Sequence, residues 1–232
     1  SGKSTLARML TRLAACDAGR ARLEGVADDY LALPQRALAP VRKAVQLVFQ
    51  DPYASLNPRR TVGQSIAMGP IAQGTPRAQA LRDARELLGR VSVDPRSADR
   101  YPHEFSGGQR QRIVIARALA MQPRLLIADE PVSSLDVSVQ AEILDLLDEI
   151  QRRDGVGMIF ITHDLRVASR MADRILVMNA GRVVESGTAQ QVLTDPRHPY
   201  TQQLLAAVPK MERAGRDTEP HDHELRRAQC QT

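Results

Sequence analysis

Four short apolar runs, separated by longer stretches with helical spacing, restrict the fold of this 232-residue chain more than any other feature. Strands that alternate with helices pair in parallel, because each intervening helix returns the chain to the same end of the sheet. The pattern therefore predicts an α/β fold with a parallel sheet. The runs cover residues 44–49, 125–128, 158–162 and 175–179. A weaker run at residues 21–24 is expected to form a further short strand.

The helices are expected where apolar residues recur every three or four positions. Between residues 51 and 100 prolines punctuate two helical stretches and no strand-like run occurs, which predicts a helical subdomain inserted into the core at about residues 51–121. The core itself is expected to cover residues 1–209. Residues 210–232 contain almost no apolar side chains and are predicted to be disordered. The predicted helices are residues 2–15, 62–68, 77–91, 137–153, 165–172 and 200–208, and one from Ser106 to Met121.

Composition excludes several classes of protein. Hydrophobic residues make up 43% and charged residues 25% of the chain, as in ordinary globular proteins. The net charge of +5 is spread along the chain and is compatible with phosphate ligands or an anionic surface. Three Phe, four Tyr and no Trp are too few stacking platforms for a single-strand nucleic-acid binder. Two separated cysteines, Cys16 and Cys230, make a disulfide framework or a zinc site unexpected. No run is long enough to span a membrane and no secretory signal is recognisable, so a cytosolic location is expected.

The chain begins with Ser-Gly-Lys-Ser-Thr, which matches the second half of the phosphate loop G-x-x-x-x-G-K-[ST]. In such a loop Gly2 lets backbone N–H groups approach phosphate oxygens, Lys3 reaches the terminal phosphates, and the Ser4 hydroxyl binds Mg²⁺ at a helix N-terminus. An ordinary helix start is the alternative explanation of this short motif.

Two adjacent carboxylates, Asp129 and Glu130, follow the apolar run at residues 125–128. Open α/β sheets bind their ligands at the carboxyl ends of the strands. There one carboxylate can support Mg²⁺, and the other can polarise a water molecule that attacks a phosphate. The alternative is a strand that simply stops where polar residues begin.

The sequence Ser106-Gly107-Gly108-Gln109 opens a predicted helix as a capping box, with Ser106 as N-cap and Gln109 three residues later. A capping box is structurally routine, but two consecutive glycines in a first helical turn are unfavourable. Their cost is understandable if the bare backbone lies against a phosphate.

With these motifs in order, the chain resembles the ATP-binding subunits of ABC transporters. The motifs that carry the resemblance are GKST at residues 2–5 (Walker A), Gln50 in VFQDP (Q-loop), SGGQ at 106–109 (signature), LLIADE at 125–130 (Walker B), SSLD at 133–136 (D-loop) and THD at 162–164 (switch histidine).

The resemblance implies ATP and Mg²⁺ as ligands and a role for each matching residue. Gly2, Lys3, Ser4 and Thr5 would hold phosphates, with Ser4, Gln50 and Asp129 at the metal. Glu130 would be the general base, Gln50 would sense the metal and the attacking water, and His163 would contact the γ-phosphate. The signature residues Ser106, Gly107, Gly108 and Gln109 would bind the nucleotide of an opposite subunit. Asp136 would lie at the dimer contact, although an Asp before a helix is equally good as an N-cap.

Two segments resemble the oligopeptide, dipeptide and nickel importer branch, namely DPYASLNPR at residues 51–59 and RHPYTQQLL at residues 197–205. Pro199 and Tyr200 also have a simpler explanation, in which the proline begins a helix and the tyrosine is an aromatic residue that packs against its neighbours. Membership implies an ATPase at the cytoplasmic face of the inner membrane and several partners. These are a second ATPase subunit (identical or different), permease subunits and, indirectly, a substrate-binding protein, but no nucleic acid. Residues 51–68 would form part of the groove for a permease helix, with the exposed face of residues 62–68 in contact. The iron–sulfur cluster of some members is not expected here.

The family has residues before the position of Ser1, including the first half of the phosphate loop and a central strand, so we expect this chain to be a fragment of a longer product. Without that strand, neighbouring ladders would be left unpaired and apolar side chains uncovered. Two other functions remain as alternatives. One is a soluble ABC-type ATPase acting on DNA or the ribosome, although the insertions or tandem cassettes of those relatives are missing. The other is a non-catalytic fragment.

Overall fold

The computed structural model describes residues 2–26 and 28–207. The predicted tail and Cys230 lie outside the described residues. A three-stranded parallel sheet in the order β1-β2-β3 is formed by Val45–Val48, Leu125–Asp129 and Gly157–Ile161. Val48 pairs with Ala128, and Ala128 pairs with Phe160, so the strands end at one edge. The prediction of a parallel α/β core is confirmed.

Two separate apolar clusters cover the two faces of this sheet. Leu126 of β2 packs with the helices α6 (Gly107–Leu119) and α7 (Val137–Asp154). Ile127, the next residue, packs on the other face with Ala7 of α1 (Lys3–Leu10) and Val41 of α2 (Ala39–Ala44). The alternation follows from the two-residue period of a strand and places α1 directly behind the carboxyl end of β2.

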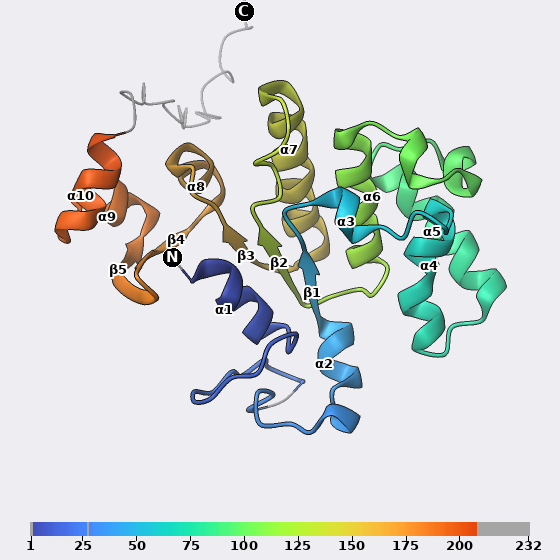
Figure 1. Ribbon diagram of the computed structural model, residues 1–232, viewed down its shortest axis with the longest axis horizontal. Helices are drawn as coiled ribbons and strands as arrows, with labels where there is room; N and C mark the ends of the chain where they lie inside the picture. The colour runs from blue at the N-terminus through green and yellow to red at the C-terminus, as the bar shows by residue number, and fades with distance from the viewer. Residues whose placement is uncertain (1, 27, 208–232) are drawn as a thin grey trace, which may run out of the picture.

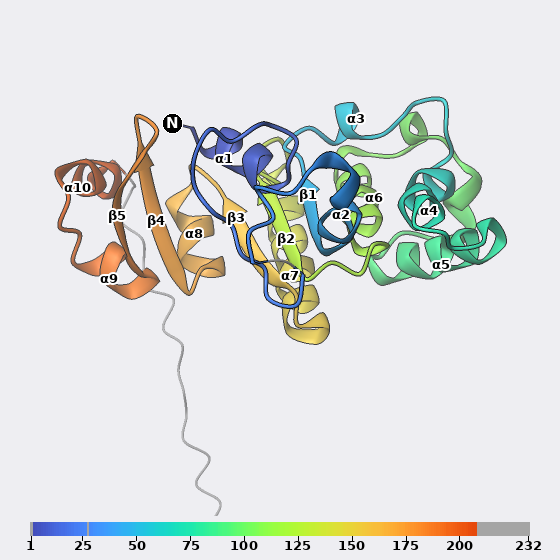
Figure 2. The ribbon, with the colours of Figure 1, turned by 90° about the horizontal axis from the view of Figure 1, so that it is seen from below.

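The regular elements between β1 and β2 are all helical, and they lie at one end of the molecule (Figure 1). In Figure 2, the view turned by 90°, these helices again lie at the end of the molecule away from β4 (Arg174–Asn179) and β5 (Arg182–Thr188). The elements are α3 (Pro52–Ser55), α4 (Val62–Ala72), α5 (Arg77–Arg90), α6 and the 3-10 turns Pro95–Asp99 and Pro102–Glu104. The expected helices 62–68 and 77–91 therefore form.

The expectation that α4 presents an exposed face over residues 62–68 is wrong. Val62, Ile66 and Ala67 are fully buried in the core of the helical region, and Met68 is the exposed apolar residue of this stretch. The reason is that α4 packs between α5 and α6 and therefore uses its apolar side chains for the core.

Two other local predictions are also wrong. The helix expected at residues 2–15 ends at Leu10, because Thr11 Oγ1 donates to the Ala7 carbonyl at 2.9 Å and Arg12 adopts a left-handed φ of 58°. The strand expected at residues 21–24 does not form. There the Ala21 N–H donates to the Asp29 carboxylate at 3.2 Å, and Val26 closes a turn on Leu23. The segment instead leads through a short 3-10 turn, Gln35–Ala37, to α2.

In the C-terminal part, the strand expected at residues 175–179 forms, but the expectation that it joins the parallel sheet is wrong: it pairs in an antiparallel hairpin with a strand that the sequence analysis missed. β4 (Arg174–Asn179) pairs with β5 (Arg182–Thr188) around Ala180 and Gly181, which both have positive φ, as tight hairpin turns require. Helices α8 (Leu165–Met171), α9 (Ala189–Thr194) and α10 (Pro199–Ala206) complete this part. Within the described ranges, β3 has a ladder partner on one edge only, and no helix is long and apolar enough to cross a membrane.

Candidate functional site

The carboxyl edge of the three-stranded sheet collects side chains from four separate motifs. Asp129 is the last residue of β2 and is buried at 7% exposure, and Glu130 follows it with a left-handed φ of 48°. The Glu130 N–H donates to the Ile161 carbonyl of β3 at 2.9 Å, which fixes the turn. A non-glycine residue with positive φ is uncommon and is often found at functional sites.

The first residues of α1 bond to this edge. Lys3 Nζ donates to the Thr162 carbonyl at 2.9 Å, and the Ser4 hydroxyl donates to Asp129 Oδ1 at 3.1 Å. Gly2 precedes the helix with φ 86°, a conformation that side chains rarely adopt. Thr5 also lies in the first turn but is exposed. The structure therefore brings an ammonium, a hydroxyl and a carboxylate to one helix N-terminus.

Glu130 lies between a glutamine and a histidine from different elements. Gln50, two residues after β1, has its Nε2 3.4 Å from Glu130 Oε2 and 3.4 Å from Ser133 Oγ. His163 Nδ1 lies 3.0 Å from the same Glu130 oxygen. The side chain of Glu130 is 17% exposed and that of His163 is 67% exposed, so the pair borders solvent.

The residue after His163 fixes the start of α8. Asp164 Oδ1 accepts the Arg166 N–H at 2.8 Å and thereby caps the helix. The Arg166 side chain, hydrogen-bonded to the same carboxylate, lowers the pKa of Asp164 below its usual range. The cap is therefore ionised at neutral pH and holds the His163 segment in place.

The signature residues are not part of this cluster. Ser106 Oγ accepts the Gln109 N–H at 3.3 Å, and Gln109 Oε1 accepts the Ser106 N–H at 3.0 Å, which is the expected capping box. Among residues 2–26 and 28–207, no hydrogen bond joins Ser106, Gly107, Gly108 or Gln109 to the motif residues at the sheet edge. Both views place α1 and α6 on opposite sides of the three strands (Figures 1 and 2). Asp136, the N-cap position of α7, is exposed and makes no side-chain capping bond.

The two signature glycines differ in their surroundings. A Cβ on Gly107 would meet Leu135 Cδ2 at an ordinary 3.7 Å, whereas a Cβ on Gly108 would lie 2.5 Å from a methyl group of Val139 in α7. Close packing between α6 and α7 thus explains Gly108 without any ligand. It does not explain Gly107, where an alanine would fit.

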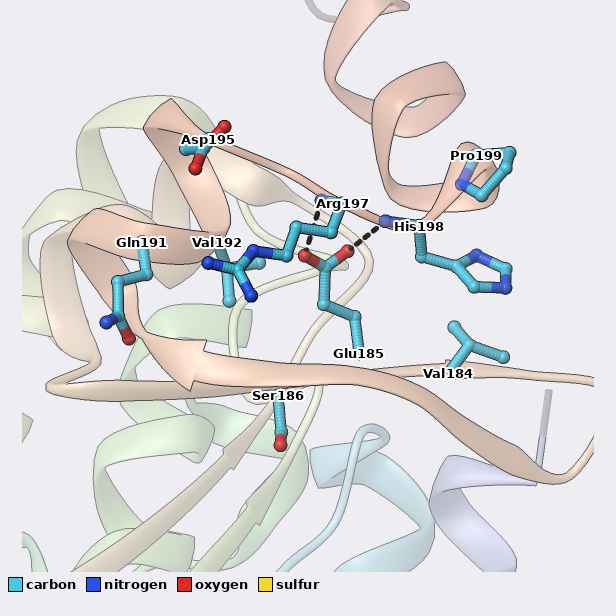
Figure 3. Close-up of a pocket in the computed structure, with 9 residues that line it drawn as sticks. All are labelled: Val184, Glu185, Ser186, Gln191, Val192, Asp195, Arg197, His198 and Pro199. Atoms are coloured by element: carbon cyan, nitrogen blue, oxygen red, sulfur yellow. Dashed lines mark hydrogen bonds between the residues drawn. The ribbon is translucent and has the colours of Figure 1, made fainter.

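A cavity of about 450 Å³ lies away from this edge, between β5, α9 and the start of α10 (Figure 3). Its polar groups are largely paired with one another. Glu185 accepts the backbone N–H groups of Arg197 at 2.8 Å and His198 at 3.1 Å, while His198 Nδ1 accepts the Tyr200 N–H at 3.1 Å. The hydrogen bonds from Arg197 and His198 to Glu185 therefore hold the start of α10 against β5. We call this contact the Glu185 clamp. The sequence analysis did not predict it.

Comparisons with known proteins give a consistent picture. The chain matches the ABC transporter family over residues 1–133 and a region described as the oligopeptide/dipeptide transporter C-terminal region over residues 184–231. It is 47% identical over 219 residues to a glutathione import ATP-binding protein of Pectobacterium atrosepticum, covering 94% of this chain and 35% of the relative. It is 45% identical over 210 residues to a putative peptide import ATP-binding protein of Brucella ovis, covering 90% and 66%. The chain thus spans about a third of the length of the first relative and about two thirds of the length of the second.

Two solved structures share the fold. One is a dimeric post-hydrolysis state of an ATP-binding cassette bound to ADP and phosphate, with TM-score 0.71 and 28% identity, covering 81% of each chain. The other is a protein from Clostridium perfringens described as part of an ABC transporter complex, with TM-score 0.72 and 30% identity, covering 84% of this chain and 75% of that one.

The glycine contacts generate a stability prediction. Gly107→Ala should raise the stability of α6 by up to about 1 kcal/mol, since alanine is the better helix former and the site has room. Gly108→Ala should not show this increase in stability, because the new methyl group would force Val139 to shift or rotate. Urea unfolding of the two variants beside the unchanged chain measures the difference. Equal destabilisation by both would contradict the packing account.

The Glu185 clamp generates a pH prediction. The backbone N–H of Arg197 is the largest cause that lowers the pKa of Glu185, so the folded state favours its ionised form. A lowered folded-state pKa stabilises the fold above the ordinary Glu pKa of about 4.3, and this stability is lost as the pH falls through the folded-state pKa. Glu185→Gln presents an NH₂ group to one of the two N–H donors. Its melting temperature should lie below that of the unchanged chain at pH 7, and the gap should shrink in acid. An equal gap at pH 7 and pH 3 would contradict the clamp.

Proposed function

The chain belongs to the ABC transporter family, and from that membership we propose that it binds and hydrolyses ATP to energise an importer of peptides. The observation that supports the proposal most directly is the convergence of Lys3, the Ser4–Asp129 pair and the Gln50–Glu130–His163 group at one sheet edge. We further propose that it acts as a peripheral subunit at the cytoplasmic face of the inner membrane, together with permease subunits and, through them, a binding protein.

The donors at this edge fit ATP with Mg²⁺. Mg²⁺ prefers oxygen ligands and usually takes one or two from protein side chains, the rest being water and phosphate oxygens. The Ser4 hydroxyl and the Asp129 carboxylate, 3.1 Å apart, supply such oxygens. Lys3 and the N–H groups of the first turn of α1 would bind phosphate oxygens. The bound ion would neutralise charge that develops on the phosphate during hydrolysis.

Glu130 would accept the proton of the attacking water. Its two side-chain contacts, from Gln50 and His163, use the same oxygen, Oε2, and would keep the carboxylate oriented toward the nucleotide. Gln50 would sense the water and the metal, and His163 would contact the γ-phosphate.

A second subunit would complete the site. Ser106 and Gly107, which are not bonded to the Lys3 cluster in this chain, would contact the nucleotide of the partner, and Asp136 would lie at the same interface. The exposure of Ser106 and the dimeric state of one structural relative support this arrangement.

The names of the relatives favour the importer over the alternative of an ATPase acting on nucleic acid or ribosomes. One relative is named for peptide import and another for import of glutathione, itself a small peptide. A peptide is therefore a better candidate substrate than nickel. Met68, the exposed apolar residue at residues 62–68, remains the candidate permease contact on α4.

The base assignment predicts the behaviour of Glu130→Gln. Because an amide preserves the shape but does not accept the proton, hydrolysis should fall by about 10²–10⁴-fold while ATP is still bound and ATP-bound dimers accumulate. Phosphate release and size-exclusion chromatography measure the two effects in the assembled transporter. Glu149→Gln, an exposed position on α7, serves as the control. A Glu130→Gln variant that hydrolyses ATP at the unchanged rate would remove Glu130 from this role.

The shared site predicts the behaviour of Ser106→Arg. ATP binding to the same subunit should stay within about twofold, whereas dimer closure and hydrolysis should be lost, because the arginine fills the contact with the partner's phosphates. The substitution also removes a helix cap, worth about 1 kcal/mol. Thr188→Arg removes the equivalent capping box of α9 and serves as the matched control. If isolated Ser106→Arg subunits bind ATP much more weakly, the contact lies within one chain and the proposal is wrong.

A further inference from the structure

Two arginines of α6 hold the short helix α3, which begins two residues after Gln50. Arg110 Cζ lies 3.8 Å from the centroid of the Tyr53 ring. Arg117 Nη1 donates a hydrogen bond to the Ser55 carbonyl. The two arginines are seven residues apart and therefore project from one face of α6. The segment after Gln50 is thus attached to the helix that carries Ser106.

Arg110 is an unusual residue for this position because it is 8% exposed. Its Nε donates to the Pro102 carbonyl at 2.7 Å and its Nη2 to the His103 carbonyl at 3.2 Å. Its buried Nη1 has no hydrogen-bond partner within the described residues, and no carboxylate there forms an ion pair with it. A buried cation needs compensation, and the electron-rich face of the Tyr53 ring provides it.

Tyr53 contrasts with Arg110 because 65% of it is exposed. It contributes little to the core, and its backbone N–H is already bonded to the Asp51 carboxylate at 2.8 Å. Removing the ring therefore leaves the local backbone supported. Burial in the core therefore does not explain why an aromatic ring lies at this position, whereas its close contact with Arg110 does.

The contacts form a continuous path between two motifs that do not touch each other. Gln50 Nε2 lies 3.4 Å from Glu130 Oε2 at the sheet edge. Three residues later Tyr53 stacks on Arg110, whose own N–H donates to the Ser106 carbonyl at 2.9 Å. The path therefore runs from Glu130 to Ser106 through one aromatic–guanidinium contact.

We infer that Tyr53 and Arg110 are positioning residues that make the Gln50 segment move together with the N-terminus of α6. This inference rests on the proposed function. With the stacking intact, Gln50 stays at Glu130 when Ser106 is held against the partner's nucleotide. Without it, the two segments move independently, and a closed dimer has Gln50 in place for only part of the time. The stacking thus acts on turnover and not on ATP binding.

The test compares Tyr53→Ala, Tyr53→Phe and Arg110→Met in the assembled transporter. Tyr53→Ala should lower kcat about threefold to tenfold, the range that a cation–π contact supports, with ATP affinity unchanged and the melting temperature lowered by no more than about 4 °C. Tyr53→Phe keeps the ring and should restore kcat. Since both changes break the same contact, Tyr53→Ala should lower kcat no further when Arg110→Met is already present. Arg85→Met, which removes an exposed ion pair of the same helical region, is the control.

Three results separate the possible failures. If Tyr53→Ala and Tyr53→Phe both turn over ATP like the unchanged protein, the inference is wrong. If Tyr53→Ala lowers the melting temperature by clearly more than this and weakens ATP binding along with kcat, the ring is structural and the inference is also wrong. If the unchanged transporter does not hydrolyse ATP at all, it is the proposed function that fails.

Discussion

The parallel pairing of β1, β2 and β3 is the constraint on which the rest of the site depends. Because the three strands run in the same direction and in register, the residues that follow them reach one edge of the sheet. Gln50, the Asp129–Glu130 pair and His163 are distant in sequence but meet there. A register slip of one residue would exchange the two faces of β2 and bury the wrong side chains. The same apolar packing that fixes the fold therefore fixes the geometry of the cluster.

Sequence patterns predicted the features that depend on long periodic segments or on fixed local spacing. The strands β1, β2 and β3 and the helices from α4 to α7 formed close to the expected bounds, because their apolar residues are also the core. The capping box of Ser106 and Gln109 formed as expected, because it depends on residues three positions apart.

The missed features depend on contacts distant in sequence or on backbone conformation. α1 is shorter than its apolar spacing predicts, because the backbone at Arg12 has a positive φ and the Arg12 side chain donates to the Leu33 carbonyl. The close approach of Gly108 to Val139 was hidden because it lies between two helices. The β4–β5 hairpin gave only a weak signal, because Gly181 suits a positive φ whereas Ala180, the other turn residue, does not. The roles of individual site residues stay predictions until they are measured.

The central claim is that Lys3 of one subunit and Ser106 of the other serve the same nucleotide. The most direct measurement mixes two inactive variants, Lys3→Ala and Ser106→Arg, and follows ATP hydrolysis. In a mixed dimer one site would have both residues intact and the other would have neither. The account predicts that each variant alone is inactive and that an equal mixture regains hydrolysis at about a quarter of the unchanged rate, because half of the dimers are mixed and each of these has one intact site of two. A mixture that forms dimers and still does not hydrolyse ATP would contradict a site shared between subunits.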